Sequence, residues 1–152
     1  MVSDKPLIKR IYLDLDDVLV DFYGYALLAL GISHEDMLNK LSIDRRWNTA
    51  EVLGISHDEF WEKLSAGGFN WNLVPDMPHT EAFVEYLKEL KCEITILSTP
   101  RPESECYAGK INTIRRVMKD PDFVRFDLIV DKHRLASPES LLIDDSELNC
   151  LS

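Results

Sequence analysis

Residues 10–20 read Arg-Ile-Tyr-Leu-Asp-Leu-Asp-Asp-Val-Leu-Val, an apolar run that ends in three carboxylates and then becomes apolar again. An apolar strand that leads into acids places them at its carboxyl end, where parallel α/β sheets bind their ligands. Asp14 and Asp16 are two positions apart, so in an extended chain both side chains leave on one side. Carboxylates this close repel unless a cation or a shared proton relieves them. Mg²⁺ fits such a site when a substrate phosphate completes its shell.

The alternative for this stretch is a strand followed by an acidic turn in which Asp17 caps a helix. A second acid pair favours a site, because the apolar residues 141–143 lead directly into Asp144 and Asp145. That pair alone would also suit a solvated strand end. Between the two acidic stretches, the β-branched run 93–97 ends in the hydroxyls of Ser98 and Thr99. The sequence therefore predicts three strands that end in acid, hydroxyl and acid.

Length and composition indicate one soluble globular domain, or one domain with an insertion. The chain has 152 residues, 45% of them hydrophobic and 29% charged, and a formal net charge of −10. This charge argues against nucleic acid as a partner. Cys92, Cys106 and Cys150 form no Cys-x-x-Cys pair, which argues against a disulfide framework and zinc and favours a cytoplasmic location. We find neither a signal-peptide core nor an 18-residue apolar span, so we expect no membrane association.

Helical signals fill the region that follows the first strand. Residues 22–30 have apolar side chains at helical spacing, and Gly31 is placed to end that helix. Short helical segments follow, with N-cap candidates at Ser33, Asn48 and Ser56, and no strand signal interrupts them. We therefore expect residues 1–21 and 79–152 to form an α/β core and residues 22–78 to form an inserted helical cap.

The remaining pattern predicts a helix from Thr80, a strand at 94–97, a helix at 103–118 and strands at 126–130 and 141–143. Strands that alternate with helices in this order are typical of a parallel sheet with right-handed crossovers. The expected fold class is a Rossmann-like parallel sheet flanked by helices.

The motifs resemble those of the haloacid dehalogenase-like (HAD) phosphohydrolases. Residues 14–19 are similar to the first motif of that superfamily, Ser98 to the second, and Asp144-Asp145 to the fourth. Residues 98–100, Lys110, Asp131-Lys132 and residues 142–145 more narrowly resemble its 5′(3′)-deoxyribonucleotidase branch, although Ser146 stands where that branch often has arginine. The resemblance implies a HAD-like fold and a Mg²⁺-dependent phosphomonoesterase that acts through an aspartyl-phosphate, with a nucleoside 5′-monophosphate as the leading substrate.

The resemblance also implies roles for the acids. Asp14 is the expected nucleophile and a metal ligand. Asp16 is the expected general acid and then base, and its backbone carbonyl is a further metal ligand. Asp145 is the expected third protein ligand of the metal, and Asp144 is expected to orient the waters that the metal holds.

Hydroxyls and lysines are the candidates for the phosphate. Ser98 and Thr99 can hydrogen-bond its oxygens. Lys110 lies 12 residues after Ser98, similar to the lysine of the third motif, and Lys132 competes for that role. Either lysine could instead be an ordinary surface residue, and both could contact the phosphate.

Four aromatic residues lie within 12 positions beside a Gly-Gly pair. We expect Phe60 in the core and Trp61, Phe69 and Trp71 near the substrate, where either tryptophan could stack on a nucleobase. The four histidines have no metal-ligand spacing and receive no role. Other readings are a HAD phosphatase for another small phosphate ester, or a catalytically idle module that binds phosphate or a partner. The chain is expected to be a monomer or a homodimer.

Overall fold

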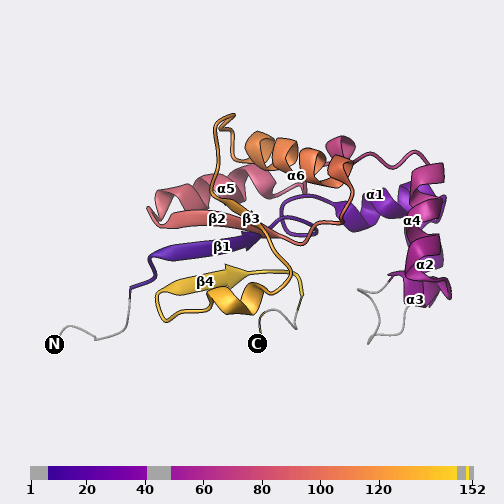
Figure 1. Ribbon diagram of the computed structural model, residues 1–152, viewed down its shortest axis with the longest axis horizontal. Helices are drawn as coiled ribbons and strands as arrows, with labels where there is room; N and C mark the ends of the chain where they lie inside the picture. Colours follow the sequence, from indigo (N-terminus) through magenta and orange to yellow (C-terminus); the bar gives the residue numbers. More distant parts are fainter. Residues whose placement is uncertain (1–6, 41–48, 147–149, 151–152) are drawn as a thin grey trace.

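The computed structural model describes residues 7–40, 49–146 and 150 (Figure 1). The elements of the α/β part are a strand β1, a helix α5, a strand β2, a helix α6 and the strands β3 and β4, with a short 3₁₀ helix η2 before β4. Helices α1 to α4 and a 3₁₀ helix η1 lie between β1 and α5. Their bounds are β1 Arg10–Asp14, α1 Phe22–Leu30, α2 His34–Lys40, α3 Thr49–Leu53, α4 His57–Ala66, η1 Trp71–Leu73, α5 Thr80–Glu89, β2 Glu93–Ser98, α6 Ser104–Val117, β3 Phe126–Leu128, η2 Lys132–Leu135 and β4 Ser140–Ile143.

The described strands form one parallel sheet in the order β3-β2-β1-β4. Leu13 of β1 pairs with Ile96 of β2 on one side and with Ile143 of β4 on the other. The chain winds outward from β1 to β3 and then returns to the far side of β1, so the strand order reverses between β1 and β4. Ligands of open α/β sheets bind at such a switch point. The predicted fold class is confirmed, although β3 ends at Leu128, two residues earlier than expected.

One face of the sheet is covered by α5 and α6. The main hydrophobic cluster joins strand residues to both helices, and each large aliphatic side chain buried there contributes roughly 1.5–3 kcal/mol. On the opposite face, η2 and the sheet residues Tyr12, Leu97 and Leu142 line an open pocket of about 130 Å³. The central members of the main cluster are Ile11, Leu13, Ile94 and Ile96 from the strands, Val84 and Leu87 from α5, and Ile114 and Val117 from α6.

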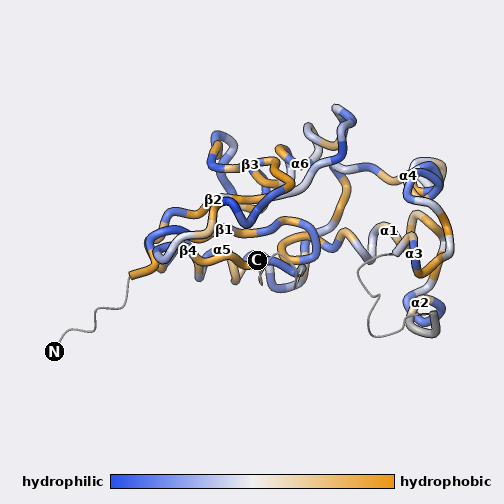
Figure 2. Tube along the Cα trace, turned by 60° about the horizontal axis from the view of Figure 1, so that its bottom comes forward, coloured by the Kyte–Doolittle hydropathy of each residue, from blue (hydrophilic) through white to orange (hydrophobic). Residues whose placement is uncertain are grey.

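Helices α1 to α4 lie at one end of the molecule, beyond the carboxyl edge of the sheet, and the turned view of Figure 2 shows the same separation. Helices α1, α3 and α4 share a small cluster of Ala26, Ala50, Phe60 and Leu64. Described residues between β1 and β2 contain helices but no strand, as expected for a helical insertion. The division into a core and a cap at residues 22–78 stays a prediction. None of the described helices is both long and apolar enough to cross a membrane.

Local signals account for several helix ends. Gly31 ends α1 in the left-handed region with φ 70°, as predicted. The hydroxyls of Ser33 and Ser56 accept the backbone N–H groups of Asp36 and Glu59, both at 3.1 Å. These two predicted N-caps are therefore confirmed, and Asn48 lies outside the described residues.

The cap of α1 is not Asp17, which the alternative reading of the first stretch suggested. Asp21 caps that helix, because its carboxylate accepts the Gly24 N–H at 2.9 Å. Asp17 instead holds a left-handed turn with φ 59° and accepts the Tyr23 N–H at 2.8 Å. The turn after β1 is thus fastened to the start of α1 by two separate carboxylates.

A close backbone contact attaches η1 to α6. A side chain at Gly109 would place its Cβ 2.3 Å from the Cβ of Trp71 and 3.0 Å from the Trp71 carbonyl carbon. Only glycine permits this approach. Asn112 supports it by donating to the Asn72 side-chain oxygen at 2.9 Å. Gly109 therefore fixes where Trp71 sits relative to α6.

Gly109→Ala should destabilise the fold by about 1–3 kcal/mol, because the added methyl group overpacks against Trp71. Helix propensity alone would stabilise this variant by roughly 1 kcal/mol, so the sign of the change tests the contact. Urea unfolding monitored by circular dichroism measures it. Ala108→Ser adds one heavy atom at the exposed neighbouring position and should stay within about 0.5 kcal/mol of the wild type. A Gly109→Ala variant as stable as the wild type would contradict the packing.

Candidate active site

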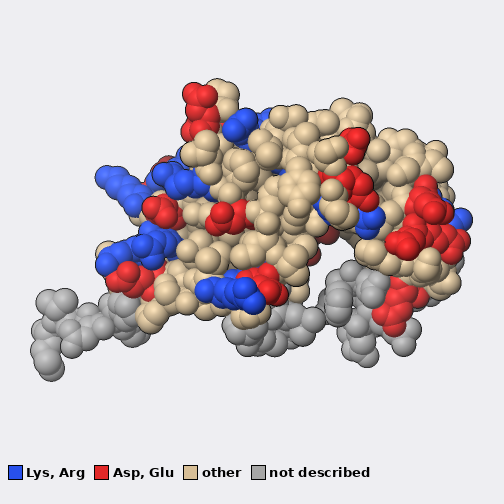
Figure 3. Space-filling view, in the orientation of Figure 1, with Lys and Arg blue, Asp and Glu red and all other residues tan. Residues whose placement is uncertain are grey.

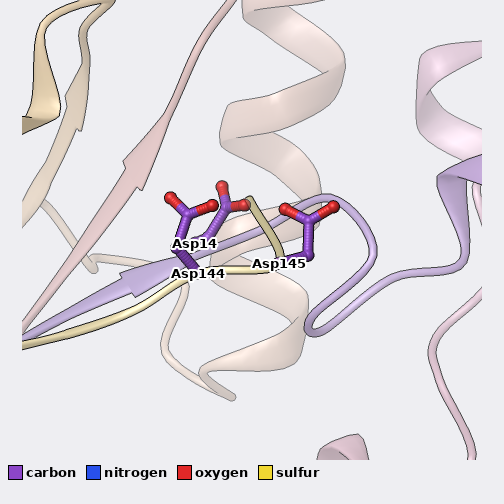
Figure 4. A group of neighbouring side chains, drawn as sticks. All are labelled: Asp14, Asp144 and Asp145. Carbon is purple, nitrogen blue, oxygen red and sulfur yellow. The ribbon is translucent and has the colours of Figure 1, made fainter. Parts of the chain in front are cut away.

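Three carboxylates meet where β1 and β4 end. Asp14 is the last residue of β1, and Asp144 and Asp145 follow β4 directly. One oxygen from each of these residues lies within 4.8 Å of the others, and Figure 4 shows the three side chains on one side of the strand ends. The parallel pairing of β1 with β4 produces this meeting, as the sequence predicted. The Asp16 carboxylate is not a member of the group, and it faces Lys110 instead.

Lys132 lies between two of these acids. Its ammonium donates to Asp14 Oδ1 and to Asp144 Oδ2, both at 2.8 Å, and its side chain is only 3% exposed. Burial lowers the pKa of Lys132, but the Asp14 and Asp144 carboxylates outweigh that effect and raise it above its ordinary value. Lys132 is therefore a permanent cation at the β1–β4 junction.

Lys110 lies between Asp16 and Ser98, two further residues that the sequence predicted for the site. It enters from α6, with its side chain 2% exposed, and donates to Asp16 Oδ2 at 2.5 Å and to Ser98 Oγ at 2.7 Å. Ser98 is fully buried at the end of β2. The sequence left open which of Lys110 and Lys132 has the principal role toward phosphate, and it allowed both to contact it. Both lie in the site, each between a different pair of side chains.

The acids at the centre bind protons more tightly than free carboxylates. Burial raises the pKa of Asp14 well above its ordinary value, the nearby Asp145 carboxyl raises it further, and Lys132 opposes both effects. Burial also raises the pKa of Asp145. This cluster is short of positive charge despite Lys132. Three hard oxygen donors, with neither His nor Cys among them, suit Mg²⁺ or Ca²⁺ better than zinc.

Thr99 differs from the other predicted phosphate ligands. Its side chain is exposed, and its hydroxyl donates to the Ile129 carbonyl at 3.1 Å. That proton is directed at the segment after β3 and not at the two lysines. Donation to a phosphate by Thr99 would require this hydrogen bond to break.

The predicted substrate aromatics lie together beside Lys110. The Trp71 ring centre is 5.2 Å from Lys110 Nζ, and Trp61 stacks on Trp71 at 5.6 Å with the ring planes 25° apart. Phe69 meets Trp71 edge-on at 4.9 Å. We call Trp61, Phe69 and Trp71, with Phe22 of α1 packed against all three, the aromatic column. Phe60 is 5% exposed and lies in the core, as expected.

Arg101 and Phe22 were missed by the sequence analysis. The Arg101 guanidinium carbon lies 4.3 Å from the centre of the Trp61 ring. The signal for Arg101 was its position between Pro100 and Pro102, in the loop that follows Ser98 directly. Phe22 was assigned only to a buried helix. His57 had no predicted role, and its Nε2 accepts the Trp61 indole N–H at 3.2 Å.

A search of solved structures finds proteins with a similar fold. No protein-family model and no curated protein sequence matches the chain. Among solved structures, a haloacid dehalogenase-like hydrolase from Bacteroides fragilis matches 93% of this chain and 80% of its own at 18% identity, with a TM-score of 0.58. This chain has a HAD-like fold. A HAD-superfamily hydrolase of subfamily IA from Geobacter sulfurreducens matches 98% of this chain and 83% of its own at 15% identity, with a TM-score of 0.49.

A partly buried acid close to this carboxylate group, Asp17, predicts a dependence of stability on pH. Burial raises the pKa of Asp17 from 3.8 to about 7. The folded state therefore holds a proton that the unfolded state releases at lower pH, and the stability from this proton is lost as the pH rises toward 7. In EDTA, the contribution of Asp17 to the free energy of unfolding should fall between pH 4 and pH 7.

Asp17→Asn retains an oxygen for the Tyr23 N–H but does not titrate, so its profile should be shallower than that of the wild type. The difference should be a fraction of the roughly 1.4 kcal/mol per pH unit that one titrating group can supply. Chemical denaturation at a series of pH values measures it, and Asp122→Asn at an exposed loop position is the matched control. Parallel profiles for Asp17→Asn and the wild type would contradict the prediction.

Proposed function

We propose that this chain is a Mg²⁺-dependent phosphomonoesterase that works through an aspartyl-phosphate intermediate. The observation that carries the proposal is the pair of buried lysines, each between side chains from different strand ends. Lys132 lies between Asp14 and Asp144, and Lys110 between Asp16 and Ser98. Two fixed cations beside a nucleophilic carboxylate are what transfer of a phosphoryl dianion requires.

The metal would be held by Asp14 and Asp145, with the backbone carbonyl of Asp16 as the expected further ligand. Both Asp144 oxygens already accept hydrogen bonds, from Lys132 and from the Ser146 N–H, each at 2.8 Å, which supports a role in orienting water. When bound, Mg²⁺ supplies positive charge next to the transferred phosphoryl group.

Phosphate binding falls to the buried lysines. The chain carries a net charge of −10, and Figure 3 shows acidic side chains gathered over the helical end. The site still favours an anion, because Lys110 and Lys132 are buried and therefore act at short range with little screening by water. Ser98 can donate its hydroxyl to the same phosphate, and Thr99 can do so only after it releases Ile129.

Asp14 is the proposed nucleophile. Lys132 and the Leu15 N–H both donate to its Oδ1, at 2.8 and 2.9 Å, so the attack falls to Oδ2. Asp16 is the proposed general acid, which gives a proton to the leaving oxygen and later takes one from water. An arriving phosphate would compete with the Asp16 carboxylate for the Lys110 ammonium.

The proposed substrate is a nucleoside 5′-monophosphate, with deoxyribonucleotides preferred. The aromatic column supports this proposal, because it begins 5.2 Å from Lys110 and a leaving group on that side would meet Trp71 first. Other small phosphate esters are the alternative substrates. A catalytically idle module would retain the same lysines but show no turnover, so turnover of phosphate esters separates it from the enzyme.

Activity should require Mg²⁺ and disappear in excess EDTA, because the three acids repel one another without a cation. Asp145→Asn should weaken Mg²⁺ binding by about 10- to 100-fold or more while the fold remains. Phosphate release at a series of Mg²⁺ concentrations, with thermal melting as the folding control, measures both effects. Full activity in EDTA would exclude the metal-dependent reading.

Asp14→Asn should abolish turnover, because the amide cannot form the phosphoryl-enzyme. Asp16→Asn should slow turnover by about 10²- to 10⁴-fold, and by most for substrates with poor leaving groups, which need the proton. Steady-state rates on an alkyl phosphate and on p-nitrophenyl phosphate separate the two roles. If Asp14→Asn kept the wild-type rate, Asp14 could not be the nucleophile.

Trp71→Ala should lower kcat/KM for thymidine 5′-monophosphate by roughly 5- to 150-fold if the ring contacts the base, the equivalent of about 1–3 kcal/mol of stacking. The same variant should barely change the rate on p-nitrophenyl phosphate. Equal losses on both substrates would show that the column had collapsed. A wild-type rate on the nucleotide no better than on sugar phosphates would reject the nucleotide as substrate and leave the phosphatase proposal standing.

A further inference from the structure

Arg101 connects the loop that follows Ser98 to helix α4 through His57 and Trp61. Its guanidinium donates to the Glu103 carboxylate from Nη2 at 2.8 Å and from Nε at 3.1 Å. Its Nη1 lies 3.3 Å from His57 Nε2, and its Cζ lies 4.3 Å from the Trp61 ring centre. The Arg101 side chain is only 22% exposed. The contacts with Glu103, His57 and Trp61 together hold its guanidinium in one place.

The place that Arg101 holds is the stacking position on Trp61. A separation of 4.3 Å is that of a planar guanidinium over an aromatic ring. Among the described residues, the other ring neighbours of Trp61 are Phe22, His57, Phe60, Phe69 and Trp71, all from the helical segment. Arg101 is the ring's partner from the loop after β2. A planar group that stacks on the part of the Trp61 ring covered by Arg101 must therefore displace this guanidinium.

We infer that Arg101 is a specificity-determining residue, because it occupies a stacking position on Trp61 that would otherwise be open to a planar leaving group in the aromatic column. This inference rests on the proposed function and deepens it. Cation–π contacts and base–aromatic stacking have similar strengths, so the two compete and neither excludes the other. A phosphate ester without a planar ring does not enter this competition. Arg101 thus lowers the preference for planar substrates that the aromatic column would otherwise give.

Binding of two ligands that differ only in the base tests this inference. Thymidine 5′-monophosphate and 2-deoxyribose 5-phosphate are titrated calorimetrically with Mg²⁺ present, in an Asp14→Asn background that prevents turnover. Arg101→Ala should tighten binding of the nucleotide by about 3- to 30-fold, the range that cation–π contacts give at 1.4 kcal/mol per tenfold. Binding of the sugar phosphate should change by less than about 2-fold.

Charge is controlled separately, because Arg101→Ala removes a cation and leaves Glu103 unpaired. The double variant Arg101→Ala/Glu103→Gln keeps the net charge of the chain and should show the same selective gain. Arg10→Ala makes the same change of charge at the amino end of β1, away from the site, and should affect neither ligand. Glu103→Gln alone loosens Arg101 and should give a smaller gain, which keeps the test decisive if Arg101→Ala does not fold.

A selective loss of nucleotide binding in Arg101→Ala and in the double variant would overturn the inference, because Arg101 would then hold the base itself. Equal changes in the two dissociation constants, or no change in either, would also overturn the inference. Arg101 would then have only the structural role of connecting its loop to α4. Absence of turnover by the wild type on every phosphate ester would refute the proposed phosphatase, while the two dissociation constants would still decide the role of Arg101. Failure of both ligands to bind any variant would reject both proposals.

Discussion

Repulsion between carboxylates at the ends of two neighbouring strands is the constraint on which this structure depends. Parallel pairing of β1 with β4 brings Asp14 to Asp144 and Asp145, and the sheet cannot keep its register and also separate them. Lys132 relieves part of the repulsion from within the fold. Buried ion pairs of this kind add little net stability, but removal of one partner costs about 3–5 kcal/mol. A net gain in stability therefore does not explain the arrangement.

Lys110 performs the corresponding task on the other side of β1. It connects the turn after β1 to the end of β2, through Asp16 and Ser98. The two lysines come from different connections, since Lys110 lies on α6 and Lys132 begins η2. Because each crossover supplies one cation, the path of the chain positions the charges. The predicted order of strands and helices and the electrostatics of the site thus have the same origin.

Much of this arrangement could be predicted from residue order. Strand ends rich in acid or hydroxyl groups, separated by helical segments, were sufficient to predict the parallel sheet and the meeting of Asp14 with Asp144 and Asp145. The choice between Lys110 and Lys132 could not be made, because sequence spacing places a lysine on a helix but does not show which carboxylate it reaches. Thr99 shows the same limit. A hydroxyl at a strand end has several acceptors within reach, and its choice of Ile129 depends on how β2 and β3 end in space.

The sequence predicted that Trp61, Phe69 and Trp71 lie near the substrate, but it did not predict which of the rings contact one another. The position of the aromatic column depends on Gly109, where the absence of a side chain lets Trp71 approach α6 one residue before Lys110. Gly109, which sets the position of the aromatic column, is thus the sequence neighbour of Lys110, which contacts Asp16. Trp71 contacts Lys110 at one end of the column, and Trp61 contacts Arg101 at the other. Since Arg101 lies in the short loop that follows Ser98, a ligand that displaced Arg101 would disturb the backbone after Ser98, whose hydroxyl accepts a hydrogen bond from Lys110. We therefore expect the aromatic column and the pair Lys110 and Ser98 to respond to each other through these side chains.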